Sequence, residues 1–259
     1  MDNYSSASNS TPLLAVVDLR LKVWPILAAV GLAVFPILLS GATASLGTNF
    51  IGPKKAAENP WLVLYMGHTG LLIGALVCIA LLGKGKFEKF GLRFPSSRTY
   101  AGVALAWGAV AGIAMTMVDY LPNLAHHIPP ADLELSARNI AGWLSFEGLF
   151  AGTVEEILFR GLLVTFLAAT LSGRVRFWRY DVSIAGVIVA VLFCLAHLGS
   201  FWTRPLWMAT GQQAYAFGLA ILYTYFYEKS GSLLAPIIAH NAGNVIEYAL
   251  AFVMVALWR

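Results

Sequence analysis

Stretches of about 20 mostly apolar residues recur along the chain, and they constrain its fold more than any other feature. A helix of about that length crosses the hydrocarbon core of a bilayer. Inside lipid the backbone must satisfy its own hydrogen bonds, so helices are the expected form. The sequence therefore predicts an all-α, polytopic transmembrane helix bundle of about seven spans, although six or eight would also fit. The seven stretches are residues 23–39, 61–82, 100–121, 140–171, 182–198, 206–227 and 233–258.

The composition supports a surface that faces lipid. Hydrophobic residues make up 59% of the chain and charged residues only 12%, whereas soluble domains carry roughly a quarter charged residues. The net charge is +4, but no basic run alternates with aromatic residues in a way that would suit nucleic acid. We therefore expect membrane lipid as a partner and no nucleic acid.

The chain divides into a polar N-terminal tail, residues 1–22, and a single transmembrane domain, residues 23–259. No internal repeat and no soluble domain are apparent in the sequence. Arg20 and Lys22 precede the first apolar run, and Ala42–Thr43–Ala44 follows it, which resembles a signal peptide with its cleavage site. The run is long for a signal core, however, so the sequence favours an uncleaved first span.

The distribution of lysine and arginine predicts an orientation. If the loop between the second and third spans is cytoplasmic, 11 of the 17 Lys and Arg residues lie on that side and 5 on the other. The N-terminus is then inside and the C-terminus outside. The compact design with few loops favours a multi-pass protein of the bacterial inner (cytoplasmic) membrane.

Three charged residues within the fourth span carry the first functional signal. A charge at the centre of a bilayer costs at least about 2.5 kcal/mol, so sequences avoid it unless something offsets the cost. Glu156 and Arg160 are at positions i and i+4 and can form an ion pair. Glu155 is rotated by about 100° from Glu156 around the helix. The spacing therefore predicts one glutamate in an ion pair and one, Glu155, left for chemistry.

Two later spans supply further polar groups. His197 lies at the end of the fifth span, and His240 and Asn244 share one face of the seventh. A carboxylate, two imidazoles and an amide can form a hydrolytic site, in which Glu155 serves as general base and the amide donates to an oxyanion. The same Glu155, His197 and His240 could instead bind zinc, although the chain contains no HExxH motif. Spacing alone leaves both alternatives open.

Other polar residues favour structural roles. His68, in the second span, is typical of a packing or hydrogen-bonding residue. Glu147 is expected near the interface. Glu247 follows His240 by seven residues and so faces roughly the same side, where it could line a cavity. Cys78 and Cys194 lie in apolar runs, where packing is expected.

Three motifs resemble those of a known family. Residues 155–160 have the pattern EExxxR, residues 193–197 have the pattern FxxxH, and residues 240–244 have the pattern HxxxN. In this order, on separate predicted helices within residues 153–247, they look like the CPBP family of intramembrane proteases. That family includes the CAAX prenyl endopeptidases and the bacteriocin-processing or immunity (Abi-type) proteins.

The resemblance implies roles for the motif residues. Glu155 and His197 would activate a water, and His240 and Asn244 would stabilise the oxyanion. The resemblance also implies a glutamate-dependent mechanism without metal. The residues that would support these four are Glu156, Arg160 and Phe193.

The implied function is an intramembrane endopeptidase, a hydrolase acting on a membrane-associated peptide or protein that enters from the membrane. The substrate could be prenylated or carry a signal or tag. Two alternatives are a non-enzymatic immunity or scaffold protein of the same fold and a proton-coupled transporter, although no inverted repeat is visible. The predicted topology places His197 near the outer end of its span and His240 nearer the inner end of its own. A shared site therefore requires one of these helices to be shifted, broken or tilted.

Overall fold

The computed structural model describes residues 23–96, 98–131, 133–177 and 180–259, most of which are helical. The predicted tail, residues 1–22, lies outside the described residues, as does Arg179. The first half contains α1 (Val23–Ile51), α2 (Pro53–Glu58), α3 (Pro60–Gly83), η1 (Phe87–Phe90), α4 (Ala101–Asp119) and α5 (Leu121–His126). The second half contains α6 (Ala137–Ser145), η2 (Phe146–Ala151), α7 (Gly152–Glu156), η3 (Ile157–Val164), α8 (Thr165–Ala168), β1 (Arg174–Phe177), β2 (Tyr180–Ser183), α9 (Ile184–Ala196), α10 (Ser200–Thr203), α11 (Leu206–Ser230) and α12 (Leu234–Trp258).

The all-α transmembrane bundle predicted from the sequence is confirmed. Five stretches of the described chain are helical, long and apolar enough to cross a membrane: α1, α3, α4, α9 with α10, and α12. The predicted fourth and sixth spans are present as helices, but they are not among these five. The sixth, α11, carries Gln212 and Gln213, and the fourth carries the charged motif, so both are less apolar than an ordinary span. The predicted number of seven spans therefore stays a prediction.

Helix α1 is longer than the sequence predicted. The apolar run ends at residue 39, but the helix continues to Ile51 and includes Ala42–Thr43–Ala44. The hydroxyl of Thr43 donates to the carbonyl of Leu39 at 3.0 Å, and Thr48 donates to Ala44 at 2.9 Å. These bonds let small polar residues extend the helix because each hydroxyl finds an acceptor one turn back.

A short β-hairpin precedes α9, where the sequence predicted only a loop and the start of the fifth span. Strands β1 and β2 pair antiparallel, with Arg174 opposite Ser183. Arg174 holds the hairpin to α11, because its guanidinium contacts Asp181 at 2.7 Å and Glu228 at 2.8 Å. Helix α9 then begins at Ile184, and its N-cap residue Ser183 accepts a hydrogen bond from the backbone N–H of Gly186 at 3.0 Å.

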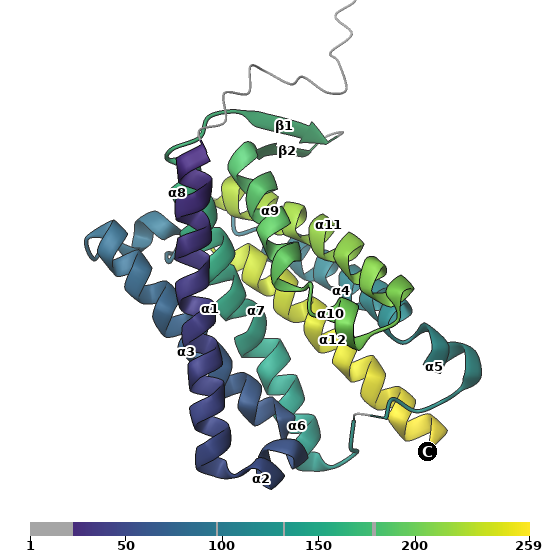
Figure 1. Cartoon of the computed structure of the whole chain (residues 1–259). Helices are drawn as coiled ribbons and strands as arrows, with labels where there is room; N and C mark the ends of the chain where they lie inside the picture. Colours follow the sequence, from purple (N-terminus) through teal and green to yellow (C-terminus); the bar gives the residue numbers. More distant parts are fainter. Residues whose placement is uncertain (1–22, 97, 132, 178–179) are drawn as a thin grey trace, which may run out of the picture.

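The helices form two sides that flank the motif-bearing stretch α6–α8. Figure 1 shows α1 beside α3 on one side and α12 beside α4 and α11 on the other, with α7 between them. Helix α9 packs on α11. A buried apolar cluster that includes Leu158, Leu162 and Val189 joins α1, α3, the motif stretch and α9. The motif stretch therefore lies in the middle of the bundle, where its polar side chains are kept from lipid.

The seam between α4 and α12 is a close contact between two long helices. A Cβ atom added to Gly108 would lie 2.5 Å from the carbonyl oxygen of Ala239, and one added to Gly112 would lie 2.5 Å from that of Gly243. Only glycine allows two backbones to approach so closely, as in the small-xxx-small seams of membrane helices. Helix α4 therefore fixes the height and rotation of α12, which carries His240 and Asn244.

Candidate active site

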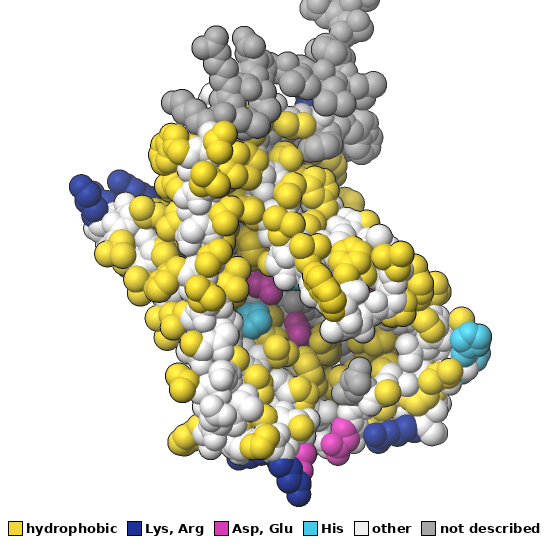
Figure 2. All heavy atoms as spheres, viewed as in Figure 1, with side chains coloured by type: hydrophobic (Ala, Val, Ile, Leu, Met, Phe, Trp, Pro, Cys, Tyr) yellow, Lys and Arg dark blue, Asp and Glu magenta, His cyan; other side chains and the backbone are white. Residues whose placement is uncertain are grey.

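A cavity of about 270 Å³ is lined by polar side chains from several helices. Its walls come from α3, α4, the motif stretch, α9, α11 and α12. Figure 2 shows acidic and histidine side chains at the bottom of a hollow in a face that is otherwise largely hydrophobic. Its ionisable residues other than tyrosine are His68, Asp119, Glu147, Glu155, His197, Arg204, His240 and Glu247. Because Asn244 also lines the cavity, all four predicted site residues meet in one place.

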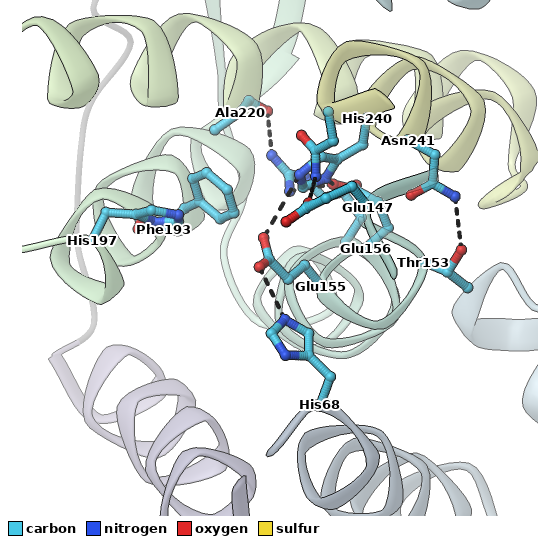
Figure 3. Close-up of polar contacts among 12 residues, drawn as sticks. His68, Glu147, Thr153, Glu155, Glu156, Phe193, His197, Ala220, His240 and Asn241 are labelled. Carbon is cyan, nitrogen blue, oxygen red and sulfur yellow. Dashed lines mark hydrogen bonds and ion pairs between the residues drawn. The ribbon is translucent and has the colours of Figure 1, made fainter. Parts of the chain in front are cut away.

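Glu155 lies at the centre of these groups. Its carboxylate is 3.5 Å from Nε2 of His68 and 3.7 Å from Nε2 of His240, and its side chain remains 19% exposed. Figure 3 shows the carboxylate between these two rings, with His197 and Phe193 to one side. Glu155 is therefore a partly accessible carboxylate that faces the cavity.

Glu156, the next residue, has the opposite surroundings. Its side chain is fully buried, and Oε1 lies 2.8 Å from Nη1 of Arg160 and 2.8 Å from Nδ1 of His240. The i, i+4 ion pair predicted from the sequence is therefore present. Because a carboxylate can only accept, the Nδ1–H of His240 donates to Glu156, which fixes the imidazole with Nε2 toward Glu155.

Arg160 completes this buried unit. Its Nη2 donates to the carbonyl of Ala220 at 3.1 Å, which links the motif stretch to α11. The guanidinium also lies 5.1 Å from the ring of Phe193 and 5.3 Å from the ring of Tyr223. Aromatic faces stabilise a cation at such distances. Phe193 thus lies beside the site, as the motif implied.

His197 reaches the cavity because the fifth helix breaks there. Helix α9 ends at Ala196, His197 is its C-cap, and α10 starts afresh at Ser200. Gln213 of α11 donates to the carbonyl of His197 at 3.2 Å, so one carbonyl freed by the break has a partner. The ring Nδ1–H donates to the carbonyl of Phe193 at 2.9 Å, which leaves Nε2 as an acceptor in the neutral ring. The break supplies the irregularity that the predicted topology required.

Glu147 is a site residue that sequence reasoning placed at the interface. It is buried, and its Oε2 accepts a hydrogen bond from Nδ2 of Asn244 at 3.0 Å. In a regular α-helix, Glu147 and Glu155 would be about 80° apart. Residues 146–151 are π-helical, and each π-helical turn holds more residues, since its hydrogen bonds reach five residues along the chain. The wider turn brings Glu147 toward the face of Glu155, and no periodicity in the sequence signals it.

His68 is a second residue whose position sequence reasoning missed. It comes from α3, outside the three motifs, and its Nδ1–H donates to the carbonyl of Leu64 at 3.1 Å. That bond directs Nε2 toward Glu155, while Phe146 packs edge-on against the ring at 4.9 Å. A single histidine in an apolar span does not indicate, from the sequence, that it contacts Glu155 on another helix.

If the site hydrolyses peptides, as the motif resemblance implies, replacement of His68 by glutamine is expected to lower turnover by about tenfold, because Glu155 loses the neighbour that orients its carboxylate. The measurement is the cleavage rate in liposomes, with the thermal unfolding midpoint recorded in parallel. His126→Gln is the matched control, since His126 is an exposed histidine on α5. An unchanged rate in His68→Gln would show that the contact has no catalytic role.

A smaller cavity of about 160 Å³ reaches the same groups from another side. It lies between α1 and α9, where Ile37 and Ser40 face Ala196. His68, Glu155 and His197 line both this cavity and the larger one. The central carboxylate is therefore bordered by space on two sides.

Gly152 allows α12 to pack directly against the motif helix. A Cβ atom at this position would lie 2.4 Å from Oδ1 of Asn241 and 2.7 Å from Cγ of His240. Asn241 is held there by a 3.0 Å hydrogen bond to Thr153. Helix α7 can pack this closely against α12 only because residue 152 has no side chain.

Gly152→Ala is expected to destabilise the protein by about 1–3 kcal/mol through overpacking and to displace the ring of His240. The expected result is a lower unfolding midpoint together with reduced activity. Gly31→Ala is the matched control, because a Cβ atom there meets nothing within 4 Å. If both variants have the same stability, the contact between the two helices is not as tight as the structure has it.

Zinc is the alternative that the spacing of Glu155, His197 and His240 leaves open. Among the residues that the structure describes, no three His, Cys, Asp or Glu side chains are placed so as to hold a metal ion.

Comparisons with known proteins match the segment that carries the site. Residues 137–246 match the family described as "Type II CAAX prenyl endopeptidase Rce1-like". The match includes all three motifs and excludes α1, α3 and α4. No curated protein and no solved structure matches the chain.

Proposed function

We propose, on the premise that residues 137–246 match the Rce1-like family of type II CAAX prenyl endopeptidases, that this chain is an intramembrane endopeptidase that uses a water activated by Glu155. The family supports a membrane-embedded protease, and the apolar helices make the chain an integral membrane protein. The proposed substrate is a membrane-associated peptide or protein, prenylated at or near its C-terminus. The proposed mechanism uses no metal.

The observation that carries this proposal is the contrast between two adjacent glutamates. Glu156 is fully buried and paired with Arg160 and His240, whereas Glu155 faces the cavity. A carboxylate confined in a closed ion pair cannot take part in proton transfer to a substrate, but one at a cavity wall can. Glu156 thus has a structural role, and Glu155 is presented to the cavity.

The proposed reaction begins with a water between Glu155 and His197. Glu155 accepts a proton from this water while Nε2 of His197, left as an acceptor, holds the second hydrogen. The water oxygen attacks the peptide carbonyl carbon and forms a tetrahedral intermediate. The C–N bond then breaks, and the proton held by Glu155 passes to the leaving nitrogen, which departs as an amine. Glu155 is thereby returned to its ionised state.

The oxyanion of the intermediate requires hydrogen-bond donors. Asn244 gives one Nδ2 hydrogen to Glu147 at 3.0 Å, so the second hydrogen of the same amide remains for the oxyanion. His240 would donate through Nε2 when its ring is protonated, since Nδ1 is engaged with Glu156. Both donors lie on α12 one turn apart, which lets them converge on one oxygen.

Cleavage of defined peptides tests the proposal. Purified protein in liposomes is incubated with farnesylated and unprenylated peptides, with and without a zinc chelator. Cleavage by the wild type but not by His197→Ala, unaffected by the chelator, is the expected result. Loss of cleavage on chelation would instead assign Glu155, His197 and His240 to a metal site.

The same assay separates the alternatives. A non-enzymatic immunity or scaffold protein would cleave none of the peptides, and its cellular function would survive Glu155→Ala. A proton-coupled transporter would also leave the peptides intact, but it would acidify or alkalinise the liposome lumen when its solute is added.

A further inference from the structure

Arg204 is the one lysine or arginine that lines the main cavity in the described part of the chain. It follows α10 directly and adopts an extended backbone conformation, with φ −127° and ψ 158°. His197 precedes it by seven residues, at the break that ends α9. The short irregular segment between α9 and α11 therefore brings both a proposed catalytic histidine and a fixed positive charge to the same cavity.

The guanidinium of Arg204 is anchored at one end. Its Nη1 lies 3.0 Å from Oδ1 of Asp119, whose side chain is only 7% exposed. Asp119 is itself held by Tyr215, whose hydroxyl donates to Oδ2 at 2.9 Å. Arginine has five N–H donors in a planar fork, and the Arg204 side chain is 38% exposed. The donors on Nε and Nη2 are thus available to a second acceptor.

The remaining charges of the cavity define where an anion could bind. Glu147 and Glu155 line it at the motif stretch, and Glu247 of α12 lies within electrostatic reach of Arg204. A carboxylate of a substrate is repelled by each of these groups. The guanidinium of Arg204 is permanently charged and offers the carboxylate a two-pronged, charge-assisted hydrogen bond, which a single imidazole N–H does not provide. Arg204 is therefore the most favourable place in the cavity for an anionic substrate group, and Glu155 lines the same cavity.

We propose that Arg204 binds the C-terminal carboxylate of the substrate and so sets how far from the chain end the peptide bond is hydrolysed. This inference rests on the proposed peptidase function. The C-a-a-X motif of the matched family lies at the end of a protein chain, so the bond to be hydrolysed is close to a free carboxylate. Arg204 is thus a specificity-determining residue, and Asp119 and Tyr215 are positioning residues that hold it.

The first test compares two farnesylated peptides that differ only in their C-terminal group, a carboxylate or a carboxamide. Wild type is expected to cleave the carboxylate peptide with a kcat/KM at least about tenfold higher, from one charge-assisted bond. Arg204→Gln should lower this value to that of the carboxamide peptide. Arg138→Gln, an exposed arginine on α6, should leave the preference intact. Equal cleavage of both peptides by wild type would overturn the inference while leaving the peptidase function standing.

A binding measurement keeps the inference testable without turnover. Glu155→Gln protein in nanodiscs is titrated with fluorescent forms of both peptides, and the expected result is tighter binding of the carboxylate form by about tenfold or more. The preference should vanish when Arg204→Gln is added. Arg204→Gln leaves the buried Asp119 carboxylate without its cation. The double variant Asp119→Asn/Arg204→Gln, which also removes the Asp119 charge, is therefore measured beside it. Equal binding of both peptides by Glu155→Gln overturns the role of Arg204 even if no peptide is cleaved by wild type.

Discussion

Glu155→Gln is expected to reduce kcat/KM by about 10²–10⁴-fold while leaving the fold unchanged, because glutamine keeps the shape of the side chain but cannot accept a proton. The Glu155 carboxylate lies at the cavity wall, 19% exposed, and not in the buried ion pair. The substitution therefore removes the proton acceptor while the buried Glu156–Arg160 pair stays intact. The measurement is peptide cleavage in liposomes, with the unfolding midpoint recorded for the same preparation.

The neighbouring residue provides the control for Glu155→Gln. Glu156→Gln makes the same change one position along the helix, but it alters the group that holds Arg160 and His240. We expect Glu156→Gln to lower the unfolding midpoint and Glu155→Gln to leave it unchanged. A Glu155→Gln protein that cleaves at the wild-type rate would remove Glu155 from the mechanism.

Arg160→Leu is expected to reduce the free energy of unfolding by about 3–5 kcal/mol, since it leaves a buried carboxylate without its cation. Both side chains of the Glu156–Arg160 pair are fully buried at 0% exposure. Arg160 also contributes its hydrogen bond to Ala220 and its contacts with Phe193 and Tyr223. The measurement is reversible unfolding in mixed detergent micelles, compared with the exposed-residue variant Arg138→Leu.

A double variant separates the charge from the packing in this prediction. Glu156→Leu/Arg160→Leu removes both charges, so much of the lost stability should return. Activity should stay low, because His240 has lost the acceptor that orients its ring. If Arg160→Leu alone is as stable as wild type, the pair is not the stabilising unit described above.

The buried charge pair is the part of the site that the sequence predicted best. A spacing of four residues on a helix fixes which side chains can meet, so Glu156 and Arg160 could be paired from the sequence alone. The rotation of about 100° per residue also separated Glu155 from Glu156. Both inferences assume a regular helix, and the Glu156–Arg160 pair forms although residues 157–164 are π-helical.

The residues that sequence reasoning missed depend on departures from that regular geometry or on tertiary contacts. Glu147 reaches the cavity through a π-helical segment, and His197 reaches it through a helix break. His68 meets Glu155 because α3 packs on α7, a contact between segments far apart in the chain. Periodicity within one segment carries no information on any of these.

The fold was predicted in outline and missed in detail for related reasons. Apolar runs identify helices that lipid can surround, so the all-α bundle followed directly. The β-hairpin before α9 and the extension of α1 to Ile51 rest on local hydrogen bonds of polar residues. Average hydrophobicity does not detect such bonds. The family resemblance named the motif residues, but it did not include α3 or α4.

The glycine seam between α4 and α12 makes these two helices one mechanical unit. With Gly108 and Gly112 against the backbone of α12, neither helix can slide or rotate without a clash. His240 and Asn244, both on α12, therefore have fixed positions in the cavity wall. Any widening of the cavity to admit a polypeptide must come from displacement of the opposite walls, where α3 and α9 carry His68 and His197. The half of the site on α4 and α12 is therefore rigid, and the half on α3 and α9 has to move.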